Sequence, residues 1–297
     1  MYRIGVIHHR KEPPWSASEL LKSIGKLGYE PVYIRIQDVD VGITSGRVKA
    51  WIHREELGVD GVIVRGLGLL FTHESFLRRI GVIRALEALV PVINNSNSIL
   101  LARDKWTTLL TLARKGLPVP DTFLSENPFT AMRLVETRGR IVYKPLTGSL
   151  GLGSTLLMDP DIAFQVSRTL LSHNQPLYLQ EYIEKPGYDV RVFIVGDRVV
   201  AAMKRVINTN WKTNIARGAH GVPLRREEDP ESYELALKAT RILGLDYSGV
   251  DIIVDKETGK HYIIEVNAFP IWKGLREATG VDPAPIIIKH LVEMIKK

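Results

Sequence analysis

A hairpin around residue 258 most constrains the fold, because it fixes which side chains share one face of a sheet. Two strand-like runs, 250–256 and 260–267, flank a loop made of Glu257, Thr258 and Gly259. Glycine in the last loop position suits the left-handed backbone that such a hairpin needs. The sequence therefore predicts two antiparallel strands with a defined register in the C-terminal part of the chain.

This register sets two acidic side chains opposite each other. If Lys256 pairs with Lys260, then Asp251 faces Glu265, and Asn267 lies on the same face, roughly 6–7 Å further along. Like charges so placed repel. A solvated face that tolerates the repulsion is one interpretation, although the flanking residues are Val, Ile and Tyr. A hard cation removes the repulsion, and carboxylate and amide oxygens commonly hold Mg²⁺ beside phosphates. We therefore predict that the hairpin is the metal floor of a nucleotide site.

The first 96 residues alternate between strand-like and helix-like segments. The expected strands are 2–7, 31–36, 61–64 and 91–93, and the expected helices are 16–27 and 74–89. This alternation predicts an α/β domain with a parallel sheet. Residues 65–68 follow a strand and so lie at the carboxyl edge, where α/β sheets bind ligands; a purely structural turn is an equal alternative.

A second domain is expected from about residue 97. Apolar residues then follow a helical stripe that ends at Gly116, namely Trp106, Leu109, Leu110 and Ala113. Residues 103–105 are charged and stand at the entry of this helix. Capping and solvation alone would explain them.

A glycine-rich loop links two further strands. The strand 141–144 ends in Lys144 and runs into the loop 145–153, which a strand over 154–158 follows. This loop opens no helix, so it is neither a Walker A loop nor a dinucleotide fingerprint. Its spacing fits a flap whose N–H groups cover phosphates while Lys144 reaches their charge; a hairpin turn without function has a similar pattern.

The apolar strand 177–183 becomes polar at its end. Such a strand end can offer backbone groups to an adenine edge, while Glu181 or Glu184 takes a ribose hydroxyl. Two strands, 189–195 and 198–206, follow as a plain hairpin.

A basic segment over 203–218 combines cations, amides and one tryptophan without any acid. Its polar members are Lys204, Arg205, Asn208, Asn210, Lys212, Asn214 and Arg217. Such donors suit developing negative charge on a carboxylate or phosphoryl group. Stacking of nucleic-acid bases on Trp211 and a simple solvated loop are the alternatives.

Composition excludes several other classes of site. The chain of 297 residues is 45% hydrophobic and 25% charged, which is ordinary for a globular protein of two or three units. Without cysteine there is no disulfide, thiolate metal site or Cys nucleophile. The formal charge of +7 suits an anionic ligand. We expect no membrane span and no signal peptide, hence a cytoplasmic protein.

Taken in order, several segments resemble the ATP-grasp ligases and, within them, the RimK-like glutamate ligases. They are RDKWTTLLTLARKGLPVPDT, VYKPLTGSLGLGS, LQEYIEKPGYDVRVFIVGDRVVAAMKR, NIARG, SGVDII and IIEVNAFP. The resemblance runs from about residue 97 to the C-terminus. It implies an α/β ATP-grasp fold with an N-terminal parallel-sheet domain (1–96), a central subdomain with the glycine flap (97–176) and a C-terminal subdomain with the Mg²⁺ site (177–297), the last two clasping ATP.

The resemblance also implies roles for individual residues in a reaction that uses ATP and Mg²⁺, with Mn²⁺ as a substitute. Arg217 and Lys144 would be catalytic, Arg217 by steadying an acyl phosphate. ATP would be contacted by Lys105, Lys144, Gly148, Ser149, Gly151, Gln180, Glu181, Tyr182, Ile183, Asp189, Lys212 and Asn214. The metal ligands would be Asp251, Glu265 and Asn267. Substrates would contact Arg65, Arg205, Arg217, Trp272 and Lys273.

The implied activity joins an amino acid, glutamate by family precedent, to a carboxylate acceptor without a side-chain nucleophile. The first domain is more similar to archaeal ligases that add glutamate to tetrahydromethanopterin than to ligases that modify a protein C-terminus. An amino-group carrier ligase of lysine or arginine biosynthesis shares most of the scaffold. A non-catalytic nucleotide- or nucleic-acid-binding module is the alternative of another functional class. The sequence is also compatible with a homo-oligomer.

The sequence departs from the family pattern at two places where substrates should lie. Ala219 and His220 follow Arg217-Gly218, and Ile271 follows Pro270, where the family often has glycine. These departures leave the ATP chemistry intact and put the identity of the substrates in doubt.

Overall fold

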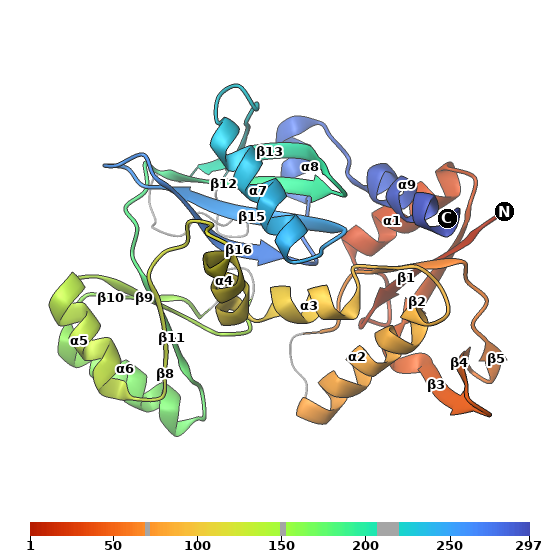
Figure 1. Cartoon of the computed structure of the whole chain (residues 1–297), viewed down its shortest axis with the longest axis horizontal. Helices are drawn as coiled ribbons and strands as arrows, with labels where there is room; N and C mark the ends of the chain where they lie inside the picture. The colour runs from red at the N-terminus through yellow and green to blue at the C-terminus, as the bar shows by residue number, and fades with distance from the viewer. Residues whose placement is uncertain (69–71, 149–152, 207–219) are drawn as a thin grey trace.

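The computed structural model describes residues 1–68, 72–148, 153–206 and 220–297 (Figure 1). Its strands form four sheets. The N-terminal sheet is parallel and has the order β2-β1-β6-β7. Its strands are β1 (Arg3–His8), β2 (Glu30–Arg35), β6 (Gly61–Val64) and β7 (Val92–Ile93). Helices α1 (Trp15–Lys26) and α2 (His73–Glu87) and the short 3-10 turn η1 (Ile36–Asp38) connect them. The parallel sheet predicted for this region is confirmed.

A small three-stranded sheet interrupts this domain between η1 and β6. It consists of β3 (Val39–Thr44), β4 (Arg47–Ile52) and β5 (Glu55–Glu56), with antiparallel pairing. Ser45 and Gly46 form its tight turn, both with positive φ. Such a two-residue turn matches the twist of the strands it joins. These three strands are not among the elements predicted for the first 96 residues.

The last helix of the chain returns to the first sheet. Helix α9 (Ala284–Ile295) packs against β6 and against α1, beside which it lies in Figure 1. The approach is close at Gly61, where an added Cβ would lie 2.7 Å from Ile295 Cδ1 and 3.2 Å from Leu291 Cδ1. Glycine is therefore required at the start of β6 for α9 to cover this part of the sheet.

Two consecutive helices lead out of the first domain. These are α3 (Ser96–Arg103) and α4 (Lys105–Arg114), and between them Asp104 caps α4 by accepting from the N–H groups of Trp106 and Thr107. The predicted helix is confirmed, but its predicted apolar stripe is wrong in part. Leu110 is exposed, whereas the buried face is formed by Thr108, Leu109 and Leu112. The reason is that α4 turns this face toward α7 and β16 of another domain.

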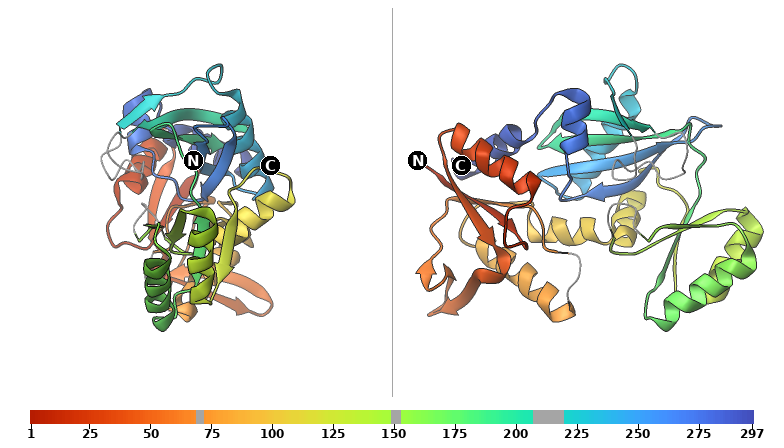
Figure 2. Two further views of the ribbon diagram at one scale, coloured as in Figure 1. Left: turned by 90° about the vertical axis from the view of Figure 1, so that its left-hand side faces the viewer. Right: turned by 180° about the vertical axis from the view of Figure 1, so that it is seen from behind.

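The central sheet has the order β10-β9-β11-β8 and is antiparallel wherever its strands pair. Its strands are β8 (Thr122–Ser125), β9 (Ile141–Lys144), β10 (Thr155–Leu157) and β11 (Leu177–Glu181). Helices α5 (Pro128–Arg138) and α6 (Pro160–Ser172) lie side by side on one face (Figure 2). One strand of this sheet, β11, therefore lies just beyond the expected end of the central subdomain at residue 176. The strand, glycine loop, strand pattern of the sequence corresponds to β9 and β10.

The C-terminal sheet is antiparallel and has the order β14-β13-β12-β15-β16. Its strands are β12 (Tyr188–Val195), β13 (Arg198–Val206), β14 (His220–Pro223), β15 (Tyr247–Val254) and β16 (His261–Asn267). Helix α7 (Pro230–Ile242) packs with one face, where Val192 points, and α8 (Lys273–Thr279) with the other, where Phe193 points. Alternate residues of β12 therefore lie on different sides of the sheet.

The β15–β16 hairpin reaches its predicted pairing by an unexpected route. Asp251 lies opposite Glu265, as predicted. The predicted pairing of Lys256 with Lys260 is wrong, because the Asp255 N–H donates to the Lys260 carbonyl and the Asp255 carboxylate closes the turn. A β-bulge next to Asp251 then shifts the register by one residue.

Candidate active site

A stripe of charged side chains crosses the C-terminal sheet from β13 to β16. In the strand register, Arg205 pairs with Asp189, Arg191 pairs with Asp251, and Asp251 pairs with Glu265. Directly opposite residues of antiparallel strands point to the same side of the sheet. The stripe therefore lies on a single face, with cations and anions on neighbouring strands.

The middle of this stripe is a buried ion-pair network. Arg205 donates from Nε and Nη2 to Asp189 over 2.6 and 2.8 Å, and its Nη2 lies 3.2 Å from Asp251 Oδ2. Arg191 forms a second two-pronged pair with Asp251, with 2.7 Å between Nη2 and Oδ2. Only 2% of Asp251 and 4% of Arg205 are exposed. Burial alone would raise the pKa of Asp251, but the two arginines outweigh it and lower this pKa.

Lys105 connects three parts of the candidate site. Its Nζ donates to the Gly148 carbonyl over 2.7 Å and lies 3.8 Å from Glu265 Oε1. The first residue of α4, the glycine loop and the β15–β16 hairpin thus meet at one ammonium group. Asn267, the next polar residue of the hairpin, donates weakly to the Gly249 carbonyl over 3.4 Å.

Lys144 lies at the end of β9 and faces the same region. Its Nζ donates to Gln180 Oε1 over 2.5 Å, and Gln180 in turn donates to Thr122 Oγ1 over 3.1 Å. Burial lowers the pKa of Lys144 to about 8, and the neighbouring Glu265 only partly offsets this effect. Burial also lowers the pKa of Lys185, against the opposing effect of Asp189. Burial is the main cause of the lowered pKa of both ammonium groups.

The segment expected to contact adenine and ribose lies beside these lysines. Gln180 and Ile183 are buried, Arg138 lies 4.0 Å from Glu181, and the Arg140 guanidinium stacks 4.5 Å from the Tyr182 ring centroid. The side chains of Gln180 and Asp189 are engaged within the protein, so contact with a nucleotide through them stays a prediction.

The residues expected on the substrate side are only partly brought together. Arg65 is 3% exposed and donates from Nη2 to the Pro270 carbonyl over 2.8 Å and from Nη1 to the Tyr247 hydroxyl over 3.2 Å. Its guanidinium also stacks 4.8 Å from the ring centroid of Trp272, which is fully buried. Lys273 is exposed at the start of α8. Arg65 and Trp272 thus form one buried contact, and direct binding of substrate by them stays a prediction.

Several predicted site residues lie outside the described residues. They are Ser149, Gly151, Lys212, Asn214 and Arg217. Within the described ranges, no group of three or more His, Cys, Asp or Glu side chains could hold a metal ion. The metal set proposed from the sequence contains an amide and two acids, so its assignment stays a prediction. No helix in the described part of the chain is long and apolar enough to cross a membrane.

Two functional candidates were not predicted from the sequence: Arg191 and Asn94. Asn94 is fully buried at the end of β7. Its Nδ2 donates to the carbonyls of Tyr247 and Ala268 over 2.9 and 2.8 Å, and its Oδ1 accepts from the N–H groups of Asp246 and Tyr247 over 2.7 and 3.1 Å. Asn94 thereby ties the first domain to the start of β15 and to the residue after β16. The Asp189-x-Arg191 spacing was a signal for Arg191, because alternate residues of a strand share a face.

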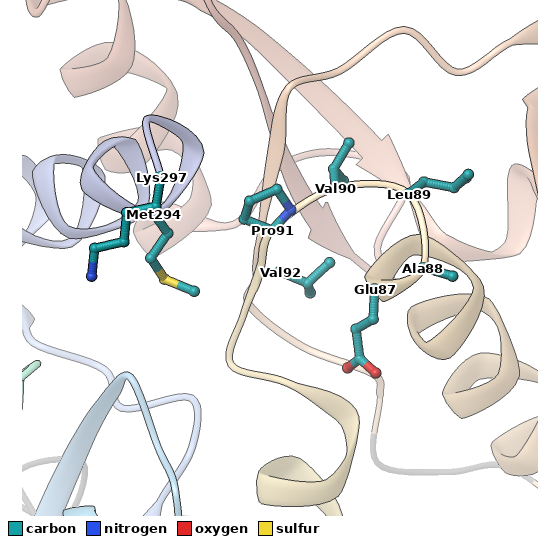
Figure 3. Close-up of a pocket in the computed structure, with 8 residues that line it drawn as sticks. All are labelled: Glu87, Ala88, Leu89, Val90, Pro91, Val92, Met294 and Lys297. Carbon is teal, nitrogen blue, oxygen red and sulfur yellow. The ribbon is translucent and has the colours of Figure 1, made fainter.

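A hollow beside β7, at the edge of the first sheet, has Glu87 and Lys297 as the charged side chains of its lining. Figure 3 shows it between the end of α2, the start of β7 and α9. It is lined by Glu87, Ala88, Leu89, Val90, Pro91, Val92, Met294 and Lys297. The Glu87 carboxylate already accepts hydrogen bonds from the N–H and the hydroxyl of Ser96.

Comparison with known proteins gives consistent results. A family model described as a RimK-like ATP-grasp domain matches residues 102–291. The chain is 31% identical to a tetrahydromethanopterin:alpha-L-glutamate ligase of Methanosarcina acetivorans, over 99% of this chain and 100% of that protein. It is also 31% identical to the alpha-aminoadipate–LysW ligase LysX of Saccharolobus solfataricus, over 96% of this chain and 100% of that protein. The structure of the ATP-grasp ligase PsnB complexed with a phosphomimetic variant of its minimal precursor, Mg and ADP has a TM-score of 0.77, with 21% identity over 98% of both chains.

Proposed function

This chain belongs to the RimK-like ATP-grasp family and is a ligase with the ATP-grasp fold, and from that premise we propose that it uses ATP and Mg²⁺ to join a carboxylate to an amine. The carboxylate is activated as an acyl phosphate, and the amine is that of an amino acid, glutamate in the leading form of the proposal. We propose that Mn²⁺ can substitute for Mg²⁺ in this reaction.

The contacts of Lys105 are the observation that carries this proposal. Its ammonium group lies 2.7 Å from the Gly148 carbonyl and 3.8 Å from Glu265 Oε1. A flap that covers phosphates and a hairpin that holds their metal must face each other across the nucleotide. Lys105 sits between these two elements, where a cation would neutralise phosphate charge.

The donor set of the hairpin suits a hard divalent cation. Glu265 is partly exposed, and the Lys105 ammonium group lies 3.8 Å from its carboxylate. Glu265 and Asn267 would thus hold Mg²⁺ through oxygen atoms. Asp251 is the third proposed ligand, although its carboxylate is bound to Arg191 and Arg205 and must share an oxygen with the metal. When bound, Mg²⁺ supplies charge neutralisation for phosphoryl transfer.

The cations around the hairpin are the residues to which we assign phosphate binding. The cations Lys144, Lys105, Arg191 and Arg205 lie beside the carboxylates of Asp189, Asp251 and Glu265 in the contacts described above. This surplus of positive charge favours an anionic ligand. Burial lowers the pKa of Lys144, and a bound phosphate would raise it.

The proposed chemistry needs no side-chain nucleophile. A carboxylate oxygen of the acceptor attacks the γ-phosphorus of ATP and ADP leaves; the amine then attacks the acyl carbon, phosphate leaves and the amine loses a proton. The glycine loop would exclude water from the acyl phosphate. We retain Arg217, which lies outside the described residues, as the group that stabilises the acyl phosphate and the tetrahedral intermediate.

We propose a small, carboxylate-bearing cofactor of the tetrahydromethanopterin type as the acceptor. The relative from Methanosarcina acetivorans supports this choice, because its similarity includes the first domain. The similarity to LysX is equally extensive, so a carrier-protein carboxylate is the second candidate. A protein C-terminus is a third form of the same acceptor chemistry.

The test measures formation of ADP and the mass of the product with ATP, Mg²⁺, glutamate and a panel of carboxylate acceptors. A gain of one glutamyl unit on a pterin acceptor supports the leading form, and modification of a lysine-pathway carrier supports the second. Glu265→Gln is expected to slow ADP formation at least about 100-fold and to raise the Mg²⁺ concentration needed. Glu257→Gln, in the exposed turn of the same hairpin, is the matched control and should behave as the wild type. Full turnover by Glu265→Gln with unchanged Mg²⁺ dependence would rule out the proposed site.

A further inference from the structure

The first domain presents a second cluster of cations at the carboxyl edge of its parallel sheet. The strand order β2-β1-β6-β7 reverses direction between β1 and β6, since the chain goes from β1 outward to β2 and then returns to β6 on the other side. Open α/β sheets bind ligands at this switch point. Here the strand ends carry His8, His9 and Arg10 after β1, and Arg65 after β6.

Glycines allow these side chains to gather closely. A Cβ added at Gly66 would lie 2.7 Å from His8 Nε2. At Gly68 it would lie 2.6 Å from Arg79 Nη1 and 3.4 Å from the His9 ring. The rings of His8 and His9 are themselves 4.3 Å apart between centroids. The loop after β6 is thus a glycine-lined wall against which two imidazoles and a guanidinium pack.

Arg79 and Arg103 bring further positive charge to this wall. Arg79 donates to the Leu67 carbonyl, and Arg103 donates to the Gly68 carbonyl over 3.1 Å. We call His8, His9, Arg10, Arg65, Arg79 and Arg103 the edge cluster. The charged groups that shift the pKa values of its histidines are all cations, and burial with these neighbours lowers the pKa of His8 to about 3. His8 is therefore neutral near pH 7, and the positive charge of the cluster, which favours an anion, comes from its four arginines.

Two buried polar atoms without partners, one of them a guanidinium donor, point to the same conclusion. Arg65 Nε and His9 Nδ1 are buried and have no hydrogen-bond partner among the described residues. Arg65 is 3% exposed, so its Nε cannot rely on bulk water. Buried polar groups without partners in the free protein are expected where a ligand supplies the partner.

The edge cluster adjoins the proposed catalytic hairpin. Arg65 belongs to the cluster and also donates to the Pro270 carbonyl, three residues beyond Asn267. A ligand that extends from the hairpin toward the first sheet would reach the cluster next. The cluster is nevertheless separate from the ion-pair network of Arg191 and Arg205.

We propose that the edge cluster is an anion subsite that binds a second acidic group of the acceptor, a carboxylate or a phosphate, apart from the carboxylate that is joined to the amine. This inference rests on the proposed function, because it specifies the chemistry of that acceptor. It requires the acceptor to carry at least two acidic groups.

The first experiment measures binding by calorimetry to the full chain saturated with MgADP, with inorganic phosphate in one arm and glutarate in the other. The wild type should bind at least one probe. Arg79→Gln should weaken that binding about ten-fold or more, because it removes a charge-assisted donor. Arg10→Gln, at an exposed position, should weaken it less and serves if Arg79→Gln does not fold. Arg84→Gln, on the same helix but contacting Asn97, is the matched control and should not change it.

The two probes distinguish the sources of the anion. Tighter binding of phosphate supports a phosphorylated acceptor, and tighter binding of glutarate supports a second carboxylate. Binding of neither probe, or equal binding by the wild type, Arg79→Gln and Arg10→Gln, would overturn the proposal.

The second experiment compares acceptors matched in pairs, with and without the extra acidic group. Arg79→Gln should raise the KM for the acceptor that has this group and leave kcat and the KM for ATP unchanged. An equal KM for both members of each pair in the wild type would contradict the subsite while leaving the ligase activity intact. If no acceptor produces ADP, the proposed function fails, and the calorimetric result still decides whether the cluster binds anions.

Discussion

Replacement of Asn94 by leucine is expected to remove the hydrogen bonds that join the first domain to the β15–β16 hairpin. The side chain is fully buried and makes four hydrogen bonds to the backbone, two donated and two accepted. Leucine has a similar volume, so packing changes little and the polar loss dominates. It leaves the carbonyls of Tyr247 and Ala268 and the N–H groups of Asp246 and Tyr247 without these partners.

The magnitude follows from the number of buried groups that lose a partner. Each costs about 1–3 kcal/mol when left unsatisfied. The Asp246 N–H is only partly buried and recovers some of its loss from water. The expected decrease in the free energy of unfolding is therefore about 4–8 kcal/mol, which is comparable with the total stability of many domains.

Urea denaturation followed by tryptophan fluorescence measures this loss, because Trp272 is buried at the same junction. Asn95→Leu is the matched control: Asn95 caps α3 through the Ser98 N–H, and loss of a cap costs about 1 kcal/mol. If Asn94→Leu destabilises the chain by no more than Asn95→Leu, the reasoning about the junction is wrong. A higher Mg²⁺ requirement is expected for Asn94→Leu alone, since Ala268 directly follows Asn267.

Three further outcomes follow from other parts of the structure. Burial lowers the pKa of Lys144 from 10.5 to about 8. Between about pH 8 and 10.5 this group therefore binds fewer protons in the ligand-free folded chain than in the unfolded chain. Its contribution to the free energy of unfolding consequently rises with pH in that window. Nucleotide phosphates should reverse the shift, so MgATP binding near pH 8.5 should take up protons; equal calorimetric heats in buffers of different ionisation enthalpy, or the same uptake by Lys144→Arg, would contradict this. Arg205→Met leaves Asp189 and Asp251 buried with less compensation and should cost about 3–5 kcal/mol in urea denaturation, whereas a change below about 1 kcal/mol would show that the network is solvated. Gly61→Val should cost about 1–3 kcal/mol by crowding α9, and a fully stable variant would show that α9 packs differently.

The local parts of the site were predictable from the sequence, whereas the contacts between distant segments were not. Hairpin chemistry and strand alternation correctly place Asp251 opposite Glu265. The partner of Asp251 on its other side is Arg191 of β12, and two further strands and α7 separate β12 from β15 in the chain. Sequence patterns give each strand a face but do not say which distant strand lies beside it.

The errors within predicted elements have the same cause. Leu110 fits the apolar stripe of α4 as a spacing pattern, but the helix turns Leu112 inward because β16 and α7 lie on that side. The bulge beside Asp251 depends on how the Asp255 carboxylate closes the turn, which residue spacing alone does not reveal. Asn94 gives no periodic signal at all, because its four partners come from another domain.

The return of α9 to the first sheet has a consequence for how the protein is made. Helix α9 follows the β15–β16 hairpin in the sequence, yet its residues Leu291 and Ile295 cover the start of β6. During synthesis, the first sheet emerges from the ribosome long before the helix that seals it. Until those residues arrive, β6 keeps an apolar face open to water, so the edge that carries the histidines and the hairpin that carries the carboxylates should reach their final form in the same late folding step.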